Sequence, residues 1–178
     1  MISPSEAMEI LSDSGCASNV IEHCRVVSEL AVGIAQDMSY TGRPVDVDLV
    51  EVGAILHDLG RSRTHGIDHA VVGAEMAADM GLGSDVIQII KFHIGAGIPR
   101  FEAVGLGLPA EDYIPMTMEE KIVAHADNLV KGTECISLDE RLSLMKLNSL
   151  NEMSIVRVKA LADEFVLTKN AAWEKAYI

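Results

Sequence analysis

Aromatic residues and long apolar runs are scarce in this sequence. Phe, Trp and Tyr make up 4% of its 178 residues, whereas all hydrophobic residues together make up 49%. This hydrophobic share predicts a folded globular protein. A core of Ala, Val, Ile, Leu and Met favours packed helices over a β-sandwich. No apolar stretch approaches the roughly 20 residues of a membrane span, so we expect no membrane segment.

Cysteines are also few. Cys16, Cys24 and Cys135 are odd in number and lack CxxC spacing, which predicts reduced thiols in a cytoplasmic protein. Residues 1–4 show neither the basic region nor the apolar region of an export signal, in agreement with a cytoplasmic location. Cys24 directly follows His23, but adjacent helix positions point about 100° apart, which disfavours Cys24 as a ligand beside it.

Basic side chains are outnumbered by acidic ones. The chain has 14 Lys and Arg against 27 Asp and Glu, a formal net charge of −13 at pH 7. An extended nucleic-acid surface needs a basic face, so we expect none. A small anionic substrate is compatible with this charge if bound metal and a few local cations reverse the field in a cleft.

Helix start and stop signals recur along the whole chain. Ser3, Thr117 and Ser137 stand where capping residues precede helices, and Gly or Pro follows several apolar runs of helical spacing. Helices are expected at about residues 4–14, 19–40, 46–60, 68–80, 85–93 and 117–131, after Ser137, and at 150–169. Because no strand alternation, repeat or linker appears, the prediction is a single all-α domain over residues 1–178.

One segment interrupts this helical pattern. Residues 95–115 contain three Pro and four Gly, which predicts a loop with a turn of helix at residues 101–103. Loops of this length inside a compact domain are often functional lids.

His57 and Asp58 are the most informative residues, because they close the apolar helical run of residues 50–56. Burying a carboxylate without a partner costs several kcal/mol, so the doublet needs a compensating positive charge. A divalent cation is the simplest one, and the negative end of the helix dipole adds to its attraction. A shared metal centre needs ligands from further helices, and four candidates stand on predicted ones: His23, His69, His93 and Asp127.

His23, the His57-Asp58 doublet and Asp127 resemble the H…HD…D signature of the HD superfamily of metal-dependent phosphohydrolases. The phrase Ile-Leu-His-Asp-Leu-Gly at residues 55–60 is close to that superfamily's core phrase, and the resemblance covers about residues 20–131. It implies an all-α bundle in which these four residues hold a divalent ion, with the C-terminal helices of residues 133–178 packed on the bundle. Imidazole and carboxylate ligands suit Mn, Fe, Co, Ni or Zn better than calcium.

His69 and His93 resemble the extra histidines of binuclear HD enzymes, including YqeK-type diadenosine tetraphosphatases. By that resemblance Asp58 bridges two metals and these histidines hold the second, so one or two ions per chain are expected. Gly73 permits the close helix approach that this requires. Alternatively, His69 is a first-turn residue and His93 a C-terminal residue favoured by the helix dipole. Many binuclear members carry His-His where Ile94 follows His93 here, which implies a weaker second site.

The resemblance also implies hydrolysis of a nucleotide, dinucleotide or other small phosphoester by a metal-activated water, with Asp58 essential to catalysis. Arg61 and Arg63 follow the doublet closely and can grip phosphate at the cleft mouth. Lys131, one helical turn beyond Asp127, is another phosphate candidate. The alternative for each cation is a solvated surface residue.

Two further histidines remain. His65 lies in the basic loop after the doublet and can contact substrate or supply a proton; the alternative is a loop residue without a role in the site. His125 is two residues from Asp127 on the same predicted helix, so its side chain points elsewhere and a structural role is expected.

Two other functional classes fit the same ligands. Some HD-fold proteins with two irons are oxygenases, and a regulatory module could bind a nucleotide without turnover. The basic loop from Arg61 to His65 favours phosphate hydrolysis over oxygenation, and the intact ligand set argues against a module without turnover. The apolar last helix is expected to pack on the domain or on a second copy of the chain, so a homo-oligomer stays open.

Overall fold

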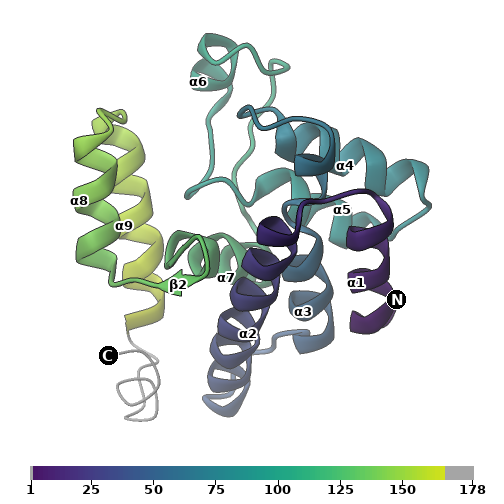
Figure 1. The fold of residues 1–178 in the computed structure, drawn as a ribbon. Helices are drawn as coiled ribbons and strands as arrows, with labels where there is room; N and C mark the ends of the chain where they lie inside the picture. Colours follow the sequence, from purple (N-terminus) through teal and green to yellow (C-terminus); the bar gives the residue numbers. More distant parts are fainter. Residues whose placement is uncertain (1, 167–178) are drawn as a thin grey trace.

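The longest helix that the structure describes is α2, with 23 residues (Figure 1). The computed structural model describes residues 2–166. Their elements in chain order are α1 (Pro4–Asp13), α2 (Ser18–Tyr40), α3 (Val47–Leu56), the 3-10 helix η1 (Leu59–Ser62), α4 (His69–Asp79), α5 (Ser84–Phe92), α6 (Arg100–Gly105), α7 (Met118–Asn128), β1 (Val130–Lys131), β2 (Glu134–Cys135), α8 (Leu138–Leu147) and α9 (Glu152–Val166).

Helix α2 buries one face against α3 and α7, and α1 covers α3 from the other side (Figure 1). Its buried positions include Val20, Val27 and Ile34, which follow the helical spacing seen in the sequence. Helix α5 also packs on both α3 and α7, so these four helices enclose the core. One interior region is therefore bordered by all four helices. The ends of α3 and α5 face it, and so do the sides of α2 and α7.

The third helix is shorter than predicted. Helix α3 ends at Leu56, and η1 begins after Asp58, so the prediction of one helix through Gly60 was wrong in its last turn. The backbone of Gly60 lies directly against α4: a Cβ atom there would be 2.0 Å from the carbonyl oxygen of His69 and 2.7 Å from the nitrogen of Gly73. Only residues without side chains permit this approach, which brings the start of α4 to Asp58.

Residues 94–115 form an arm with its own small apolar cluster. Helix α6 is longer than the predicted turn at residues 101–103, and the arm is closed at its base by a bridge between Ile98 and Tyr113. These two side chains are buried together with Ala103 and Leu108. The arm is thus an ordered hairpin-like extension beside α4 and α5 (Figure 1).

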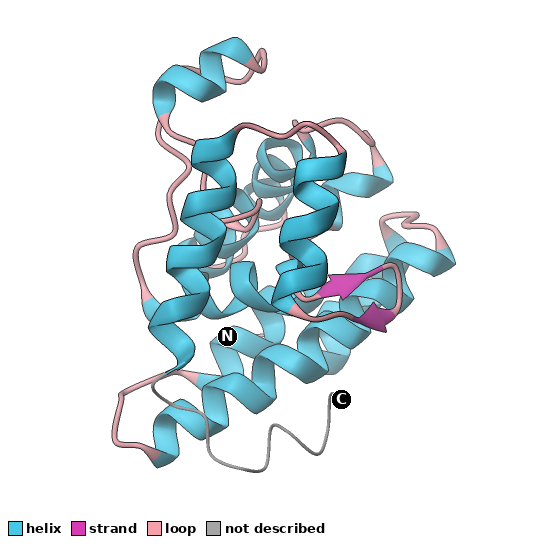
Figure 2. Ribbon diagram, turned by 90° about the vertical axis from the view of Figure 1, so that its left-hand side faces the viewer, coloured by secondary structure: helices cyan, strands magenta, loops and turns pink. Residues whose placement is uncertain are grey.

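The chain changes direction after α7. The helix ends at Asn128, and β1 pairs with β2 in antiparallel register, Val130 with Cys135 and Lys131 with Glu134 (magenta in Figure 2). The predicted helix through residue 131 was therefore too long. We call this two-stranded element, residues 130–135, the ribbon. It leads into the hairpin of α8 and α9, and α9 packs on α7.

Within the described residues, the ribbon is the only named sheet, so the predicted all-α class is confirmed. The predicted end of the last helix, at residue 169, lies outside the described residues. No helix within residues 2–166 has both the length and the apolar character needed to cross a membrane.

We expect Gly60→Ala to lower the free energy of unfolding by about 1–3 kcal/mol, because the new methyl group would overlap the backbone of α4. Gly33→Ala is the matched control. Gly33 lies within α2 and a Cβ atom there meets nothing within 4 Å, so this variant should gain roughly 0.5–1 kcal/mol from helix propensity. Urea unfolding of both variants measures the difference; equal shifts would contradict the close approach of η1 and α4.

Candidate metal centre

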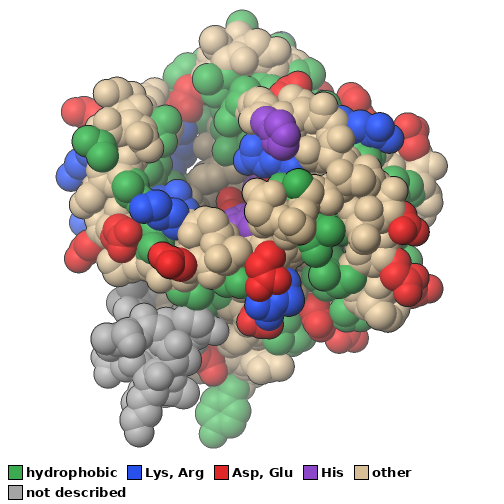
Figure 3. Space-filling view, viewed as in Figure 1, with side chains coloured by type: hydrophobic (Ala, Val, Ile, Leu, Met, Phe, Trp, Pro, Cys, Tyr) green, Lys and Arg blue, Asp and Glu red, His purple; other side chains and the backbone are tan. Residues whose placement is uncertain are grey.

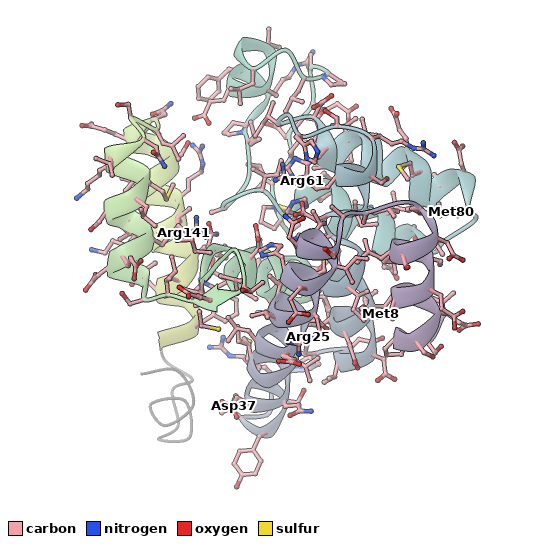
Figure 4. The ribbon with its side chains drawn as sticks, in the orientation of Figure 1. Met8, Arg25, Asp37, Arg61, Met80 and Arg141 are labelled. Carbon is pink, nitrogen blue, oxygen red and sulfur yellow. The ribbon has the colours of Figure 1, made fainter. Side chains whose placement is uncertain are left out.

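The structure brings together all six residues that the sequence singled out as metal ligands. Three groups of them place their ligand atoms within 4.8 Å of one another. The groups are His23, His57 and Asp58; His57, His93 and Asp127; and Asp58, His69 and His93. His23 and Asp127 come from α2 and α7, 104 residues apart in sequence, yet His23 Nε2 lies 3.1 Å from Asp127 Oδ1. Arg61, labelled in Figure 4, lies beside this cluster, with its Nε 3.1 Å from Asp58 Oδ1.

Each of the four histidines is oriented by a backbone carbonyl. The Nδ1–H groups of His57, His69 and His93 donate to the carbonyls of Ala54, Gly66 and Ile90, each 2.7 Å away. His23 Nδ1–H donates in the same way to the Gly132 carbonyl at 2.7 Å. A carbonyl can only accept, so Nδ1 carries a proton in each ring, and whenever a ring is neutral its Nε2 lone pair is directed at the centre.

The Nε2 atoms lie close to one another and to the two carboxylates. His69 Nε2 lies 3.1 Å from His93 Nε2 and 3.1 Å from Asp58 Oδ1. His57 Nε2 is fully buried and has no hydrogen-bond partner within the described residues; Asp127 Oδ1 and Asp58 Oδ2 are 3.6 and 3.8 Å away. Such an array of acceptors is unfavourable unless a proton or a cation lies among them.

Asp58 stands between two sets of nitrogen atoms. Its Oδ1 lies 3.1 Å from His69 Nε2 and 3.7 Å from His93 Nε2, whereas its Oδ2 lies 3.8 Å from His57 Nε2 and 4.0 Å from His23 Nε2. Ligand atoms that share an ion at about 2.1 Å lie roughly 3–3.5 Å apart. The donor set, the spacing and the unpartnered Nε2 of His57 therefore fit a transition-metal ion, and Asp58 lies between the two pairs of histidines.

The protonation states suit metal binding. Burial alone would raise the pKa of Asp58, but the charge of His57, the hydrogen bond with His69 and the charge of His93 hold that pKa well below its usual range. Burial, together with repulsion from His57 and His69, lowers the pKa of His93 to about 3. Burial also opposes ionisation of Asp127, yet the hydrogen bond with His23 and the charge of His57 keep its pKa well below the usual value. Carboxylates and neutral imidazoles are the forms that bind metals.

His57 behaves differently in the absence of a cation. Burial acts to lower its pKa, but the neighbouring acidic groups of Cys24, Asp58 and Asp127 outweigh burial and raise the pKa well above the usual value. A proton on this ring thus compensates the two carboxylates. A metal ion would take over that role and displace the proton.

The predicted phosphate-binding residues differ in their positions. Arg61 lies at the centre: its Nε donates to Asp58 Oδ1 at 3.1 Å and its Nη1 donates to the His65 carbonyl at 3.1 Å. Arg63 and the side chain of His65 are exposed in the same loop. Lys131 is exposed in β1 and not on a helix, so its expected position one helical turn beyond Asp127 was wrong. His125 stacks on Phe165 of α9, in keeping with its expected structural role.

Two residues near the centre were missed by the sequence analysis. Asn128, buried at the end of α7, donates to the Gly95 carbonyl at 2.7 Å and so holds the segment that follows His93. Arg141, in α8, donates to the carbonyls of Asp127, Asn128 and Val130. Both act through backbone carbonyls, which no sequence pattern reveals.

The centre is open on one side only. The side chains of His23 and Asp127 are 15% and 24% exposed, whereas those of His69 and His93 are 5% and 2% exposed. Figure 3 shows a hollow between the α8–α9 hairpin and the rest of the molecule, with histidine and acidic side chains at its floor and basic side chains on its rim. A ligand therefore reaches the centre from the His23 and Asp127 side.

Comparisons with known proteins agree with this geometry. The HD domain family model matches residues 20–132. An uncharacterised protein of Methanocaldococcus jannaschii is 49% identical over 160 residues, which covers 89% of this chain and 94% of that protein. A tRNA (cytidine(56)-2'-O)-methyltransferase of Thermoplasma volcanium is 45% identical over 133 residues, 75% of this chain but only 38% of that protein.

The HD domain of the L. monocytogenes phosphodiesterase PgpH, solved in complex with cyclic-di-AMP, has a similar fold. The TM-score is 0.55 at 16% sequence identity, and the match covers 88% of this chain and 92% of that domain. On the family match, which includes more than half of its residues, this chain belongs to the HD domain family.

Proposed function

We propose that this protein is a metal-dependent phosphohydrolase that cleaves a small phosphoester, with a nucleotide or dinucleotide as the preferred class. The observation that carries the proposal is the position of Asp58, whose two oxygens face two separate pairs of histidines. Membership in the HD domain family supports the hydrolase class. The proposed ligands are His23, His57, Asp58 and Asp127 for one ion and Asp58, His69 and His93 for a second.

The chain's own residues prepare the site for a phosphate group. A bound divalent ion supplies a hydroxide near neutral pH and neutralises phosphate charge. Arg61 holds Asp58 through Nε and is itself held through Nη1, so its remaining N–H groups are oriented at the edge of the centre. A guanidinium fixed in this way can donate to a nonbridging phosphate oxygen. The exposed His65 in the same loop is a candidate donor of the proton to the leaving oxygen.

Charge and access favour a small substrate. The net charge of −13 opposes binding of a long polyanion, while the basic side chains on the rim of the hollow lie where a single phosphoester would enter (Figure 3). The PgpH domain was solved with cyclic-di-AMP, so cyclic dinucleotides belong among the first compounds to test. Arg63 and Lys131 are solvent-exposed and would contribute at most to attraction of the substrate.

A panel of phosphoesters with added Mn, Co or Ni tests the proposal. We expect phosphate or nucleotide release from at least one nucleotide, linear dinucleotide or cyclic dinucleotide, and its loss in Asp58→Ala. Oxygen uptake by the iron-loaded protein, without hydrolysis, would instead establish an oxygenase. Nucleotide binding without any turnover would leave only a regulatory module.

The number of ions is testable by metal analysis at saturating Mn or Fe. Because Asp58 faces both sets of histidines, we expect up to two ions per chain in the wild-type protein. His69→Ala should retain about one ion and His23→Ala should empty the other site, each with severe loss of turnover. One ion in the wild type, unaffected by His69→Ala, would exclude the binuclear arrangement.

Arg61→Met tests the phosphate contact. Loss of a charged hydrogen bond to the substrate is worth roughly 1.5–3 kcal/mol, so we expect kcat/KM to fall about 10- to 100-fold. Arg63→Met, in the same loop but without a contact to the centre, should change kcat/KM less than threefold. Equal losses in the two variants would mean that the loop attracts phosphate only by its overall charge.

A further inference from the structure

The four histidines differ in the sequence separation between each ring and the backbone carbonyl that orients it. His57, His69 and His93 each donate to the carbonyl three residues earlier, in the same turn of chain. Their ring orientation is therefore fixed locally. His23 donates to the Gly132 carbonyl, 109 residues away, so its orientation depends on where another part of the molecule packs.

Gly132 lies in the tight turn of the ribbon. The pairing of Lys131 with Glu134 leaves two residues in the turn, and Gly132 has a φ of +63° while Thr133 does not have a positive φ. A positive φ at the first central position only is the pattern of a type II′ turn, which favours glycine there. The ribbon must keep its place against α2 for this carbonyl to meet His23.

Arg141 holds the ribbon to the end of α7. Its Nη2 donates to the Val130 carbonyl at 2.7 Å and to the Asp127 carbonyl at 3.4 Å, and its Nε donates to the Asn128 carbonyl. Figure 4 shows Arg141 reaching from α8 toward the centre of the molecule. The guanidinium thus lies at the negative end of the α7 dipole, where it contacts the backbone carbonyl of Asp127.

From these contacts we infer that Arg141 is a positioning residue for the open half of the centre. It fixes the end of α7, which carries Asp127, and the start of the ribbon, whose Gly132 carbonyl orients His23. Arg141 lies beyond residues 20–132, so this support comes from outside the segment that the family model matches. The inference rests on the proposed function, since it assigns Arg141 to the proposed metal ligands.

The inference predicts a one-sided effect. Replacing Arg141 should disturb His23 and Asp127 but leave the Asp58, His69 and His93 group intact, because those two histidines are oriented by their own turns. A residue that merely stabilised the fold would weaken both halves alike or neither.

Arg141→Met is the test variant, since it keeps the aliphatic stem and removes the guanidinium. Arg157→Met is the matched control, because Arg157 is an α9 residue whose ion pair and side-chain hydrogen bonds go to Glu102 in the arm and Ser154 in α9. Two measurements are made on the full chain. The first is the ¹⁵N chemical shifts of the histidine rings in metal-free protein at about pH 8, where an ordinary imidazole is neutral. The second is a titration with Co²⁺ alone.

In the wild type, we expect His23 as the Nδ1–H tautomer. In Arg141→Met, its two ring nitrogens should shift toward a mixture of tautomers, while those of His69 and His93 stay unchanged. The affinity of the Co²⁺ site that His23→Ala removes should fall about 10- to 100-fold, the usual effect of losing a residue that orients a ligand. Arg157→Met should leave both observables at wild-type values. Arg141→Lys keeps the positive charge but not the branched guanidinium, so its loss of Co²⁺ affinity should lie between those of the wild type and Arg141→Met.

Unchanged His23 shifts and Co²⁺ affinity in Arg141→Met would overturn the inference and leave Arg141 a structural cap. An equal loss at both Co²⁺ sites would overturn it as well. If Arg141→Met fails to fold, Arg141→Lys and Gly132→Ala decide by the same criteria, since Gly132→Ala strains the turn itself. Absence of Co²⁺ binding in the wild type would count against the proposed function, whereas the metal-free histidine shifts would still decide the role of Arg141.

Discussion

Four N–H···O=C hydrogen bonds determine the character of this centre. By fixing Nδ1 of His23, His57, His69 and His93 as donors, they turn four acceptor nitrogens toward two carboxylates in a largely buried space. Acceptors gathered in this way repel one another and are cut off from water, so they require a positive charge among them. Other contacts in the fold bring these side chains together. The glycine contact between η1 and α4 brings His69 to Asp58, and Asn128 ties the segment after His93 to α7.

Part of the required charge is already present without a metal. The raised pKa of His57 and the ion pair between Arg61 and Asp58 compensate the two carboxylates. For His57 to bind a cation through Nε2, this ring would have to lose its Nε2 proton, whereas the contact of Arg61 with Asp58 could be kept or changed. Metal binding and proton release are linked for this reason, and affinity should rise with pH as His57 loses its proton. Under the proposed function, Arg61 would pass from stabilising Asp58 to contacting a substrate phosphate.

The cluster of candidate ligands could be predicted from the sequence because its chemistry is improbable elsewhere. A His-Asp doublet at the end of an apolar run has few explanations other than a cation, and the spacing to His23 and Asp127 matched a known signature. The bounds of α3 and α7 could not be predicted as well. Helix α3 ends at Leu56, before the segment in which the Gly60 backbone packs on α4, and α7 ends at Asn128, whose carbonyl accepts a hydrogen bond from Arg141. Neither contact leaves a periodic pattern in the sequence. Lys131 was placed wrongly for the same reason, since its position assumed that α7 continued.

The two halves of the centre are supported by different parts of the chain. The buried half, with His69 and His93, depends on turns inside the family segment of residues 20–132, and it is nearly closed to solvent. The open half, with His23 and Asp127, depends on the ribbon and on a side chain from α8. The C-terminal hairpin also borders the hollow through which a ligand enters (Figure 3). A change in that hairpin would therefore alter access and ligand orientation at the open half together, while the buried half keeps its geometry. Selectivity for a substrate can vary in such an arrangement without disturbing the interior of the fold.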